Sequence, residues 1–211
     1  VKTNLESLAA LLPERPRVIV VARQTHTTNV RVITDVPTSE ELQDVDAVVT
    51  QLKDFCLCVS TADCVPVLLY DKEKQVIAAI HAGWRGTVGR IVEKTIEVMR
   101  TQYGTEGKDL VACIGPSISL ESFEVGDEVY AAFEEAGFDM TRIARRYEKW
   151  HLDLWEANRV QLLANGVLPE HIEVAGICTY QRHEDFFSAR RLGIKSGRIL
   201  SGIMLCHSSA G

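Results

Sequence analysis

Short apolar runs recur along the chain and limit the folds available to it. Their composition and spacing predict strands near residues 17–23, 29–33, 46–50, 55–60, 65–70, 75–81, 109–114, 172–178 and 198–205. Helical periodicity is restricted to residues 2–12, 87–103, 126–136 and 153–165. A chain with many strands and few helices is expected to pack mixed β-sheets together, with the helices outside. The predicted fold class is therefore α/β, or more fully mixed α+β, in a single domain spanning residues 1–211.

The bulk properties of the chain exclude several classes of protein. It has 211 residues, of which 46% are hydrophobic and 25% are charged, and its net charge is −6. This composition is ordinary for a globular protein, and the negative charge disfavours binding to a nucleic-acid backbone. No apolar run reaches the length of a membrane span, and we expect no leader at the N-terminus. The six scattered cysteines indicate reduced thiols and hence a cytoplasmic protein.

Two polar segments are expected to connect strands rather than to carry chemistry. Asp71-Lys72-Glu73-Lys74 lies between two apolar runs and reads as a charged hairpin turn. The basic run from Arg142 to Lys149 reads as a solvated connection, with a lid as the alternative.

Three side chains with metal-binding chemistry follow predicted strands: His26, Cys64 and His81. Strand ends that meet at one edge of a sheet are where α/β proteins build their sites. Two imidazoles and one thiolate form a three-ligand zinc set that leaves a fourth position open for water or substrate. The spacing is also compatible with three unrelated, partly buried residues, because no CxxC or HExxH pair holds two ligands locally.

A glycine-rich turn, His81-Ala82-Gly83-Trp84-Arg85-Gly86, joins a predicted strand to a predicted helix. Its glycines permit the close approach of a ligand, and Thr87 is expected to cap the helix, whose free N–H groups favour an anion. Arg85 adds paired donors suited to phosphate or carboxylate. The alternative is a purely structural turn around a packed Trp84.

Cys64 has a second interpretation, as a nucleophile. A cysteine beside a histidine can become a thiolate and attack acyl groups, which would make Cys64 and His81 a catalytic dyad. The adjacent Asp63 is expected to face away from Cys64 and to support the structure.

Near the C-terminus, Phe186-Phe187-Ser188-Ala189-Arg190-Arg191 places aromatic side chains beside arginines. Phe187 is a candidate for stacking on a base, and Arg190 for binding an anion. A buried phenylalanine pair with two solvated arginines is the alternative.

Short motifs follow one another along the chain: Gln24-Thr25-His26, Asp46-Ala47, Ala62-Asp63-Cys64, HAGWRG from His81, Ile114-Gly115-Pro116-Ser117-Ile118, Phe123-Glu124-Val125, Leu152-Asp153-Leu154, Cys178-Thr179 and FFSARR from Phe186. In this order they resemble the YfiH-type laccase-domain family, also called the purine nucleoside phosphorylase or polyphenol oxidase family. The resemblance covers nearly the whole chain, and ADC together with HAGWRG is highly specific.

The resemblance implies a metal site made by His26, Cys64 and His81, with zinc as the metal and copper as the alternative. It also implies phosphorolysis of adenosine, inosine or methylthioadenosine, with adenosine deamination as a further activity. The expected partners are a purine nucleoside and phosphate. Neither a nucleic acid nor a membrane is expected, and the protein is expected to be a monomer or a homodimer.

The chain departs from the family's usual pattern in three respects. Phe123 replaces a tyrosine, and Ala189 replaces an aromatic residue or histidine. Relatives also carry a further N-terminal segment that can contribute to the pocket wall.

Several functions therefore stay open on sequence alone. A zinc-dependent purine nucleoside enzyme is the leading hypothesis, with Arg85, Phe187 and Arg190 as substrate contacts. The alternatives are a cysteine amidase or peptidoglycan-precursor editing hydrolase using Cys64 and His81, a copper-linked polyphenol oxidase, and a non-catalytic metal-binding protein.

Overall fold

Within residues 2–207, the part of the chain that this computed structural model describes, six strands form a main sheet in the order β11-β7-β5-β6-β3-β2. They are β2 (Val30–Ile33), β3 (Ala47–Thr50), β5 (Val65–Asp71), β6 (Val76–Ala82), β7 (Leu110–Ile114) and β11 (Ile172–Val174). The outer pairs β2–β3 and β7–β11 are parallel, and the pairs between them are antiparallel. The sheet is mixed, as predicted.

The central hairpin of this sheet is formed by β5 and β6. All seven residues of β6 are buried. They alternate between the two faces, with Val76, Ala78 and Ile80 in one core and Ile77 and Ala79 in the other. The turn between the strands is the predicted charged hairpin turn, and the carboxylate of Asp71 accepts hydrogen bonds from two of its backbone N–H groups.

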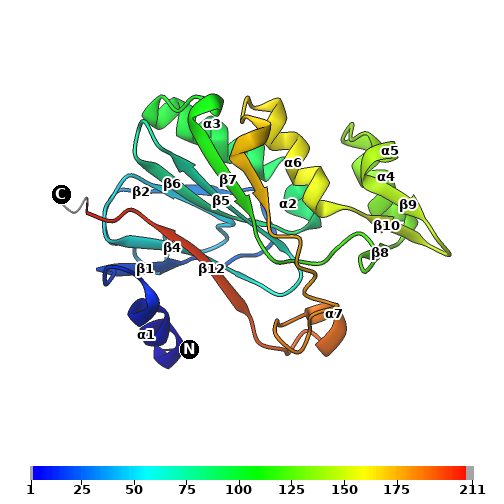
Figure 1. Cartoon of the computed structure of the whole chain (residues 1–211), viewed down its shortest axis with the longest axis horizontal. Coiled ribbons are helices and arrows are strands. Elements are labelled where there is room, and N and C mark those ends of the chain that lie inside the picture. The colour runs from blue at the N-terminus through cyan, green and yellow to red at the C-terminus, as the bar shows by residue number, and fades with distance from the viewer. Residues whose placement is uncertain (1, 208–211) are drawn as a thin grey trace.

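A second sheet of three strands covers one face of the main sheet (Figure 1). It consists of β1 (Val18–Val21), β4 (Phe55–Thr61) and β12 (Ile199–Met204). The central strand β4 pairs in parallel with β1 and antiparallel with β12. Phe55, Leu57 and Val59 of β4 point into the core between the two sheets, where they meet Ile77 and Ala79 of β6.

The opposite face of the main sheet is covered by α2 (Trp84–Val88), α3 (Ile91–Tyr103) and α6 (Leu154–Ala164), as Figure 1 shows. The buried side chains of α3 include Ile91, Ile96 and Met99, which lie on one face of the helix. Asp153 caps α6 as predicted, because its carboxylate accepts a hydrogen bond from the backbone N–H of Glu156 at 2.9 Å.

The single helix predicted over residues 87–103 is two helices. Gly83 is the N-cap of α2 and Thr87 lies inside the helix, so the predicted capping role of Thr87 is wrong. The break falls at Arg90, whose backbone is left-handed with a φ of 63°. The guanidinium of Arg90 donates to the carbonyl of Ala136 at 2.7 Å and lies 3.8 Å from the centre of the Phe138 ring. The break coincides with these contacts to a distant segment of the chain. The spacing of apolar residues along the helix does not reveal such contacts, so the sequence predicted one continuous helix.

A lobe to the right in Figure 1 contains the remaining helices and strands of the middle of the chain: α4 (Asp127–Glu135), α5 (Met140–Ile143), β8 (Glu124–Val125), β9 (Ala144–Arg146) and β10 (Trp150–Leu152). The three strands form a small sheet in the order β8-β10-β9. The basic run expected to be a simple connection, or a lid, thus contributes β9 and the turn into β10.

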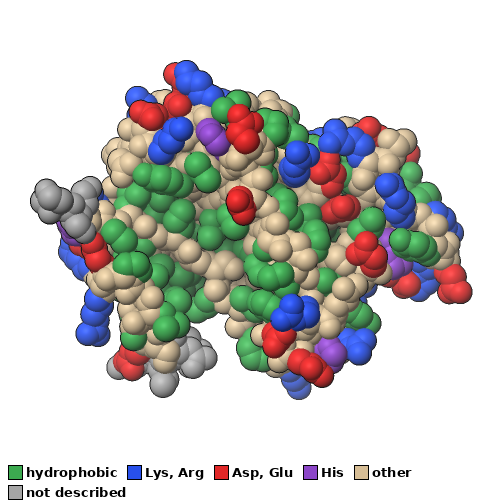
Figure 2. All heavy atoms as spheres, viewed as in Figure 1, with side chains coloured by type: hydrophobic (Ala, Val, Ile, Leu, Met, Phe, Trp, Pro, Cys, Tyr) green, Lys and Arg blue, Asp and Glu red, His purple; other side chains and the backbone are tan. Residues whose placement is uncertain are grey.

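The N-terminal helix α1 (Lys2–Leu11) lies beside the second sheet, and α7 (Ala189–Leu192) precedes β12. Figure 2 shows hydrophobic surface across the middle of the viewed face, with charged side chains around it. Val111 on β7 and Val174 on β11 are partly exposed, at 39% and 37%. No helix among the described residues has both the length and the apolar character needed to cross a membrane.

Candidate metal centre

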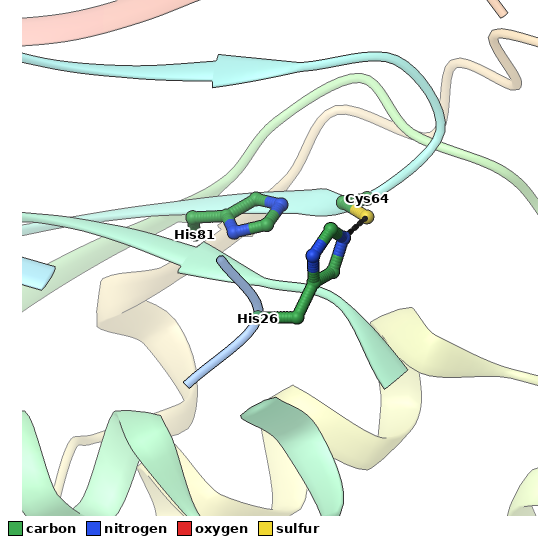
Figure 3. Close-up of side chains that lie close together, drawn as sticks. All are labelled: His26, Cys64 and His81. Atoms are coloured by element: carbon green, nitrogen blue, oxygen red, sulfur yellow. Dashed lines mark hydrogen bonds between the residues drawn. The ribbon is translucent and has the colours of Figure 1, made fainter. Parts of the chain in front are cut away.

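The three predicted metal ligands lie close together (Figure 3). His26 follows β1, Cys64 directly precedes β5, and His81 is near the end of β6. Nε2 of His26 is 3.8 Å from Sγ of Cys64. One potential ligand atom from each side chain lies within 4.8 Å of the other two. The imidazole rings of His26 and His81 meet edge to face, with their centres 4.9 Å apart.

Asp46, just before β3, connects the two histidines. Its buried carboxylate accepts hydrogen bonds from the backbone N–H groups of His26 and Thr27, at 3.0 and 2.8 Å, and from the Thr27 hydroxyl at 2.7 Å. The same carboxylate lies 2.7 Å from Nδ1 of His81. Nε2 of His81 is thereby left to face a ligand, the arrangement that a carboxylate imposes on many zinc-binding histidines.

Asp46 was known from sequence only as part of a motif, and its supporting role was missed. An available signal was its place directly before the apolar residues of β3, because a carboxylate beside a buried strand needs partners.

The turn that carries His26 is also tied to the second sheet. The side-chain amide of Gln24 donates to the carbonyl of Ser60 at 2.7 Å and accepts from the Ser60 N–H at 2.8 Å. His26 itself has a φ of 65°, a left-handed conformation that is uncommon for residues other than glycine. The hydrogen bonds of Gln24 and Asp46 hold this conformation in place.

Gly83 leaves the space that the ligands occupy. A Cβ atom at this position would lie 2.9 Å from Cδ2 of His26 and 3.1 Å from Sγ of Cys64. Such contacts are closer than van der Waals packing allows, so a larger residue would displace at least one ligand. The glycine was expected to permit the close approach of a bound ligand, and in the structure it makes room for the side chains of His26 and Cys64.

Hydrogen bonding among these residues changes their ionisation in the metal-free protein. Burial alone raises the pKa of the Cys64 thiol, but hydrogen bonds with His26 and His81 outweigh it and lower the pKa to about 6. Burial alone lowers the pKa of His81, but hydrogen bonds with Asp46 and Cys64 raise the pKa to about 9. Burial would raise the pKa of Asp46, but hydrogen bonds from His81 and Thr27 lower the pKa to about 2. At pH 7 a thiolate therefore faces a charged imidazole.

This set of donors fits a zinc ion. Bond lengths of about 2.0–2.1 Å for Zn–N and about 2.3 Å for Zn–S place tetrahedral ligand atoms about 3.4–3.6 Å apart. The 3.8 Å between Nε2 of His26 and Sγ of Cys64 is close to this separation. All three ligand atoms lie within 4.8 Å of one another, so they would have to approach one another by at most about 1 Å to bind one ion. Three protein ligands leave one tetrahedral position for water or substrate.

A cavity of about 450 Å³ opens beside the three ligands. Its lining consists of Val21, Ala22, Gln24, His26, Ser60, Thr61, Ala62, Cys64, His81, Ala189, Ile194 and Arg198. The volume is within the range of small-molecule sites. The last three lining residues come from α7 and the turn after it, and sequence reasoning did not assign Ile194 or Arg198 to a site.

Asp63 supports this wall of the cavity. Its carboxylate accepts a hydrogen bond from the Thr179 hydroxyl at 2.8 Å and another from the backbone N–H of Arg190 at 2.7 Å. The second bond joins the loop of Cys64 to the start of α7, and the first joins it to Thr179. Both agree with the structural role expected of Asp63.

The side chains expected to contact substrate lie elsewhere. Arg85 is exposed and its guanidinium stacks over Trp84, 4.3 Å from the ring centre. Arg190 donates to the carbonyl of Glu124 at 2.8 Å. Phe187 is 46% exposed. Of the described residues that line the cavity, none is Arg85, Phe187 or Arg190.

A family model described as "Multi-copper polyphenol oxidoreductase laccase" matches residues 1–206. The chain belongs to this family. The match confirms the resemblance carried by the ADC and HAGWRG motifs. Structures of other members confirm the fold: the Bacillus licheniformis hypothetical protein YfiH superposes with a TM-score of 0.89 at 29% identity, covering 96% of this chain and 80% of that chain.

Several family members have names that specify an activity. A Bacteroides thetaiotaomicron protein named purine nucleoside phosphorylase is 57% identical over 97% of this chain and 80% of its own length. A protein named adenosine deaminase RL5, from an unknown prokaryotic organism, is 45% identical over 88% of this chain and 74% of its own length. The first likeness, at 97% of this chain, includes the segments that carry the three candidate ligands.

Proposed function

We propose that the protein is a zinc-dependent purine nucleoside enzyme. Its reactions would be phosphorolysis of adenosine, inosine or methylthioadenosine and deamination of adenosine. The observation that carries the proposal is the convergence of His26, Cys64 and His81 beside a cavity of small-molecule size. The names of the two similar proteins support the choice of substrate.

The residues of the chain have defined roles in this proposal. Zinc, when bound, would act as a Lewis acid and lower the pKa of water. His26, Cys64 and His81 would hold it. Asp46 keeps a proton on Nδ1 of His81, so that Nε2 is free to bind. Arg85, Phe187 and Arg190 stay predicted substrate contacts, which would require their side chains to move towards the cavity.

Metal analysis combined with product assays tests the proposal. Purified protein should contain about one zinc per chain, release free base from inosine only when phosphate is added, and convert adenosine to inosine. Cys64→Ser should lose metal and activity together, and a chelator should reproduce most of that loss in the parent protein. Zinc-loaded protein that turns over neither nucleoside would contradict the proposal.

A cysteine hydrolase is the second candidate, because Cys64 has a pKa of about 6 and its sulfur lies within reach of the His26 and His81 imidazoles. A nucleophilic thiolate would form a covalent intermediate with an acyl substrate, and a metal ligand would not. Full activity in metal-free protein, abolished by alkylation of Cys64, would favour this candidate. The copper-linked alternative predicts bound copper and oxidation of a phenol in the same preparation.

We also propose that the protein is cytoplasmic and monomeric or homodimeric, with residues 1–211 as one domain. The six cysteines are all free thiols, which suits a reducing compartment. Light scattering on protein eluting from a size-exclusion column measures the oligomeric state.

A further inference from the structure

Arg198 is close to the metal ligands in the fold, although it is far from them in sequence. It immediately precedes β12, whose residue Ile199 pairs with Thr61 of β4. Because the two strands are antiparallel, the next step of the register places Arg198 beside Ala62, two residues before Cys64. Arg198, Thr61 and Cys64 line the same cavity.

The charge of the cavity lining favours an anion. Arg198 is the one permanently charged side chain among the described lining residues, and none of these residues is a carboxylate. Arg198 is an exposed residue at the wall of the cavity. An arginine without an acidic partner is a strong donor to phosphate-type oxygens.

The guanidinium of Arg198 is positioned by its own turn. It donates to the carbonyls of Ser196 at 2.6 Å, Gly197 at 2.9 Å and Ile194 at 3.1 Å. A guanidinium has five N–H donors, so these three contacts leave donors for a ligand. The carbonyl contacts also restrict the side chain, which lowers the entropy lost when a ligand binds.

Thr61 supplies an independent indication that the cavity takes a polar ligand. The residue is 1% exposed, and its Oγ1 has no hydrogen-bond partner among the described residues. Buried hydroxyls in folded proteins nearly always have one. Oγ1 is itself buried, so an oxyanion in the cavity would accept a hydrogen bond from this hydroxyl only after the wall that covers it shifts.

Three other arginines near the site have partners, as Arg198 does, but they do not line the cavity. The guanidinium of Arg85 stacks on Trp84, and that of Arg190 donates to the carbonyl of Glu124. Arg191 lies over the Tyr180 ring, 5.1 Å from its centre. Arg198 is therefore the arginine whose position suits a ligand in the cavity.

We infer that Arg198 and Thr61 form a phosphate-binding subsite in the cavity beside the metal ligands. Its role as the site of the second substrate of phosphorolysis rests on the proposed function. The subsite itself can be measured separately, as binding of inorganic phosphate to the zinc-loaded protein without any nucleoside.

Two reactions of the same protein provide the kinetic test, because phosphorolysis of inosine consumes phosphate and deamination of adenosine does not. Arg198→Ala should raise the KM for phosphate about 10- to 100-fold, the loss expected for a charge-assisted hydrogen bond. The KM for adenosine in deamination should change by less than about threefold. Arg198→Lys should recover part of the phosphate affinity, because it retains the charge but not the paired donors.

Thr61→Val removes the hydroxyl at nearly constant volume and should raise the KM for phosphate about 3- to 10-fold. This second variant is needed because Arg198→Ala can also weaken phosphate binding indirectly, by loosening the turn from Ile194 to Gly197. The matched control is Lys195→Ala, which removes an exposed charge from the same turn outside the cavity lining and should leave both reactions unchanged.

The outcomes separate the two proposals. If the parent shows no phosphorolysis, but phosphate titrates calorimetrically into the parent and not into Arg198→Ala, the proposed function fails and the subsite stands. If the parent does carry out phosphorolysis, and Arg198→Ala and Thr61→Val both keep its KM for phosphate, the subsite is wrong and the function stands. The subsite would also be overturned if Arg198→Ala raised the KM for phosphate and the KM for adenosine equally and Thr61→Val changed neither.

Discussion

Gly83 matters to the candidate metal centre because it has no side chain. Gly83→Ala would introduce a Cβ only 2.9 Å from the His26 ring and 3.1 Å from the Cys64 sulfur. We expect zinc affinity to fall at least about tenfold, which is typical when residues around a metal site disturb its ligands. Competition with a chromophoric chelator measures the affinity.

The neighbouring Gly86 provides the control for this substitution. A Cβ at Gly86 would meet its nearest neighbour, Cγ2 of Ile91, at 3.4 Å, an ordinary contact. Gly86→Ala should therefore keep the zinc affinity of the parent. Equal affinities in Gly83→Ala and the parent would show that the ligands adjust to the added methyl group at no cost.

Ionisation of the metal-free ligands predicts proton release on zinc binding. At pH 7, His81 with a pKa of about 9 is protonated, and Cys64 with a pKa of about 6 is already a thiolate. Because zinc requires neutral imidazole, binding should release about one proton at pH 7. The apparent affinity should rise about tenfold per pH unit between pH 6 and 9, and more steeply below pH 6, where Cys64 must also lose its proton.

Calorimetry in buffers of different ionisation enthalpy counts the protons released. No proton release at pH 7 would mean that His81 is already neutral in the metal-free protein, with its single proton on Nδ1 towards Asp46. Asp46→Asn is a useful comparison, because it removes the negative charge that stabilises the charged form of His81 and should reduce the release.

At the level of secondary-structure elements, α7 depends on the loop before β5 for its position. Asp63→Asn preserves the size of the side chain, and asparagine tolerates the φ of 87° found here. It should weaken the bonds to Thr179 or Arg190 by about 1–2 kcal/mol. Amide exchange at residues 189–193 should accelerate about tenfold, and the KM for nucleoside should rise, with zinc content retained.

Asp185→Asn is the control for this prediction. Asp185 pairs with Arg182 on the surface, and the loss of such a pair changes stability very little. Unaltered exchange at residues 189–193 in Asp63→Asn would mean that α7 is held mainly by other contacts.

The strands were predictable because their apolar runs are long compared with the turns between them. β4, β5 and β6 lie within a residue or two of the predicted ranges, and the turn at Asp71 was placed correctly. The break between α2 and α3 was not predictable, because it coincides with contacts of Arg90 to a distant segment. Similarly, the basic run was too polar to indicate β9, which exists by pairing with β10.

The candidate site was predictable to the extent that chemistry marks its residues. Histidine and cysteine after strands pointed to the three candidate ligands, whereas Asp46 and Gln24 act through hydrogen bonds that no local pattern encodes. Arg198 looked ordinary in sequence, because only the pairing of β12 with β4 brings it to the cavity.

In the whole molecule, the main sheet separates two cores and should make them unfold together. Leu57 is fully buried between the two sheets, whereas Trp84, Trp150 and Trp155 pack against the core on the helical side. Leu57→Ala should lower the free energy of unfolding by about 2–5 kcal/mol. If residues 1–211 form one domain, the unfolding transition followed by tryptophan fluorescence should report the same loss in free energy of unfolding, although the tryptophans lie in the other core.

Leu11→Ala is the matched control, because Leu11 is 83% exposed and its loss should cost less than about 0.5 kcal/mol. A fluorescence transition that stays in place while circular dichroism reports earlier melting in Leu57→Ala would mean that the two cores unfold separately.

The carboxylate of Asp46 has a consequence for the life of the protein in a cell. It fixes the turn of His26 and the ring of His81 through the chain's own hydrogen bonds, without an ion. If these hydrogen bonds suffice to hold the ligands in place before zinc arrives, the folded chain would be loaded without refolding. Under the proposed function, the amount of protein present and the amount of working enzyme become separate quantities, with zinc supply determining the second.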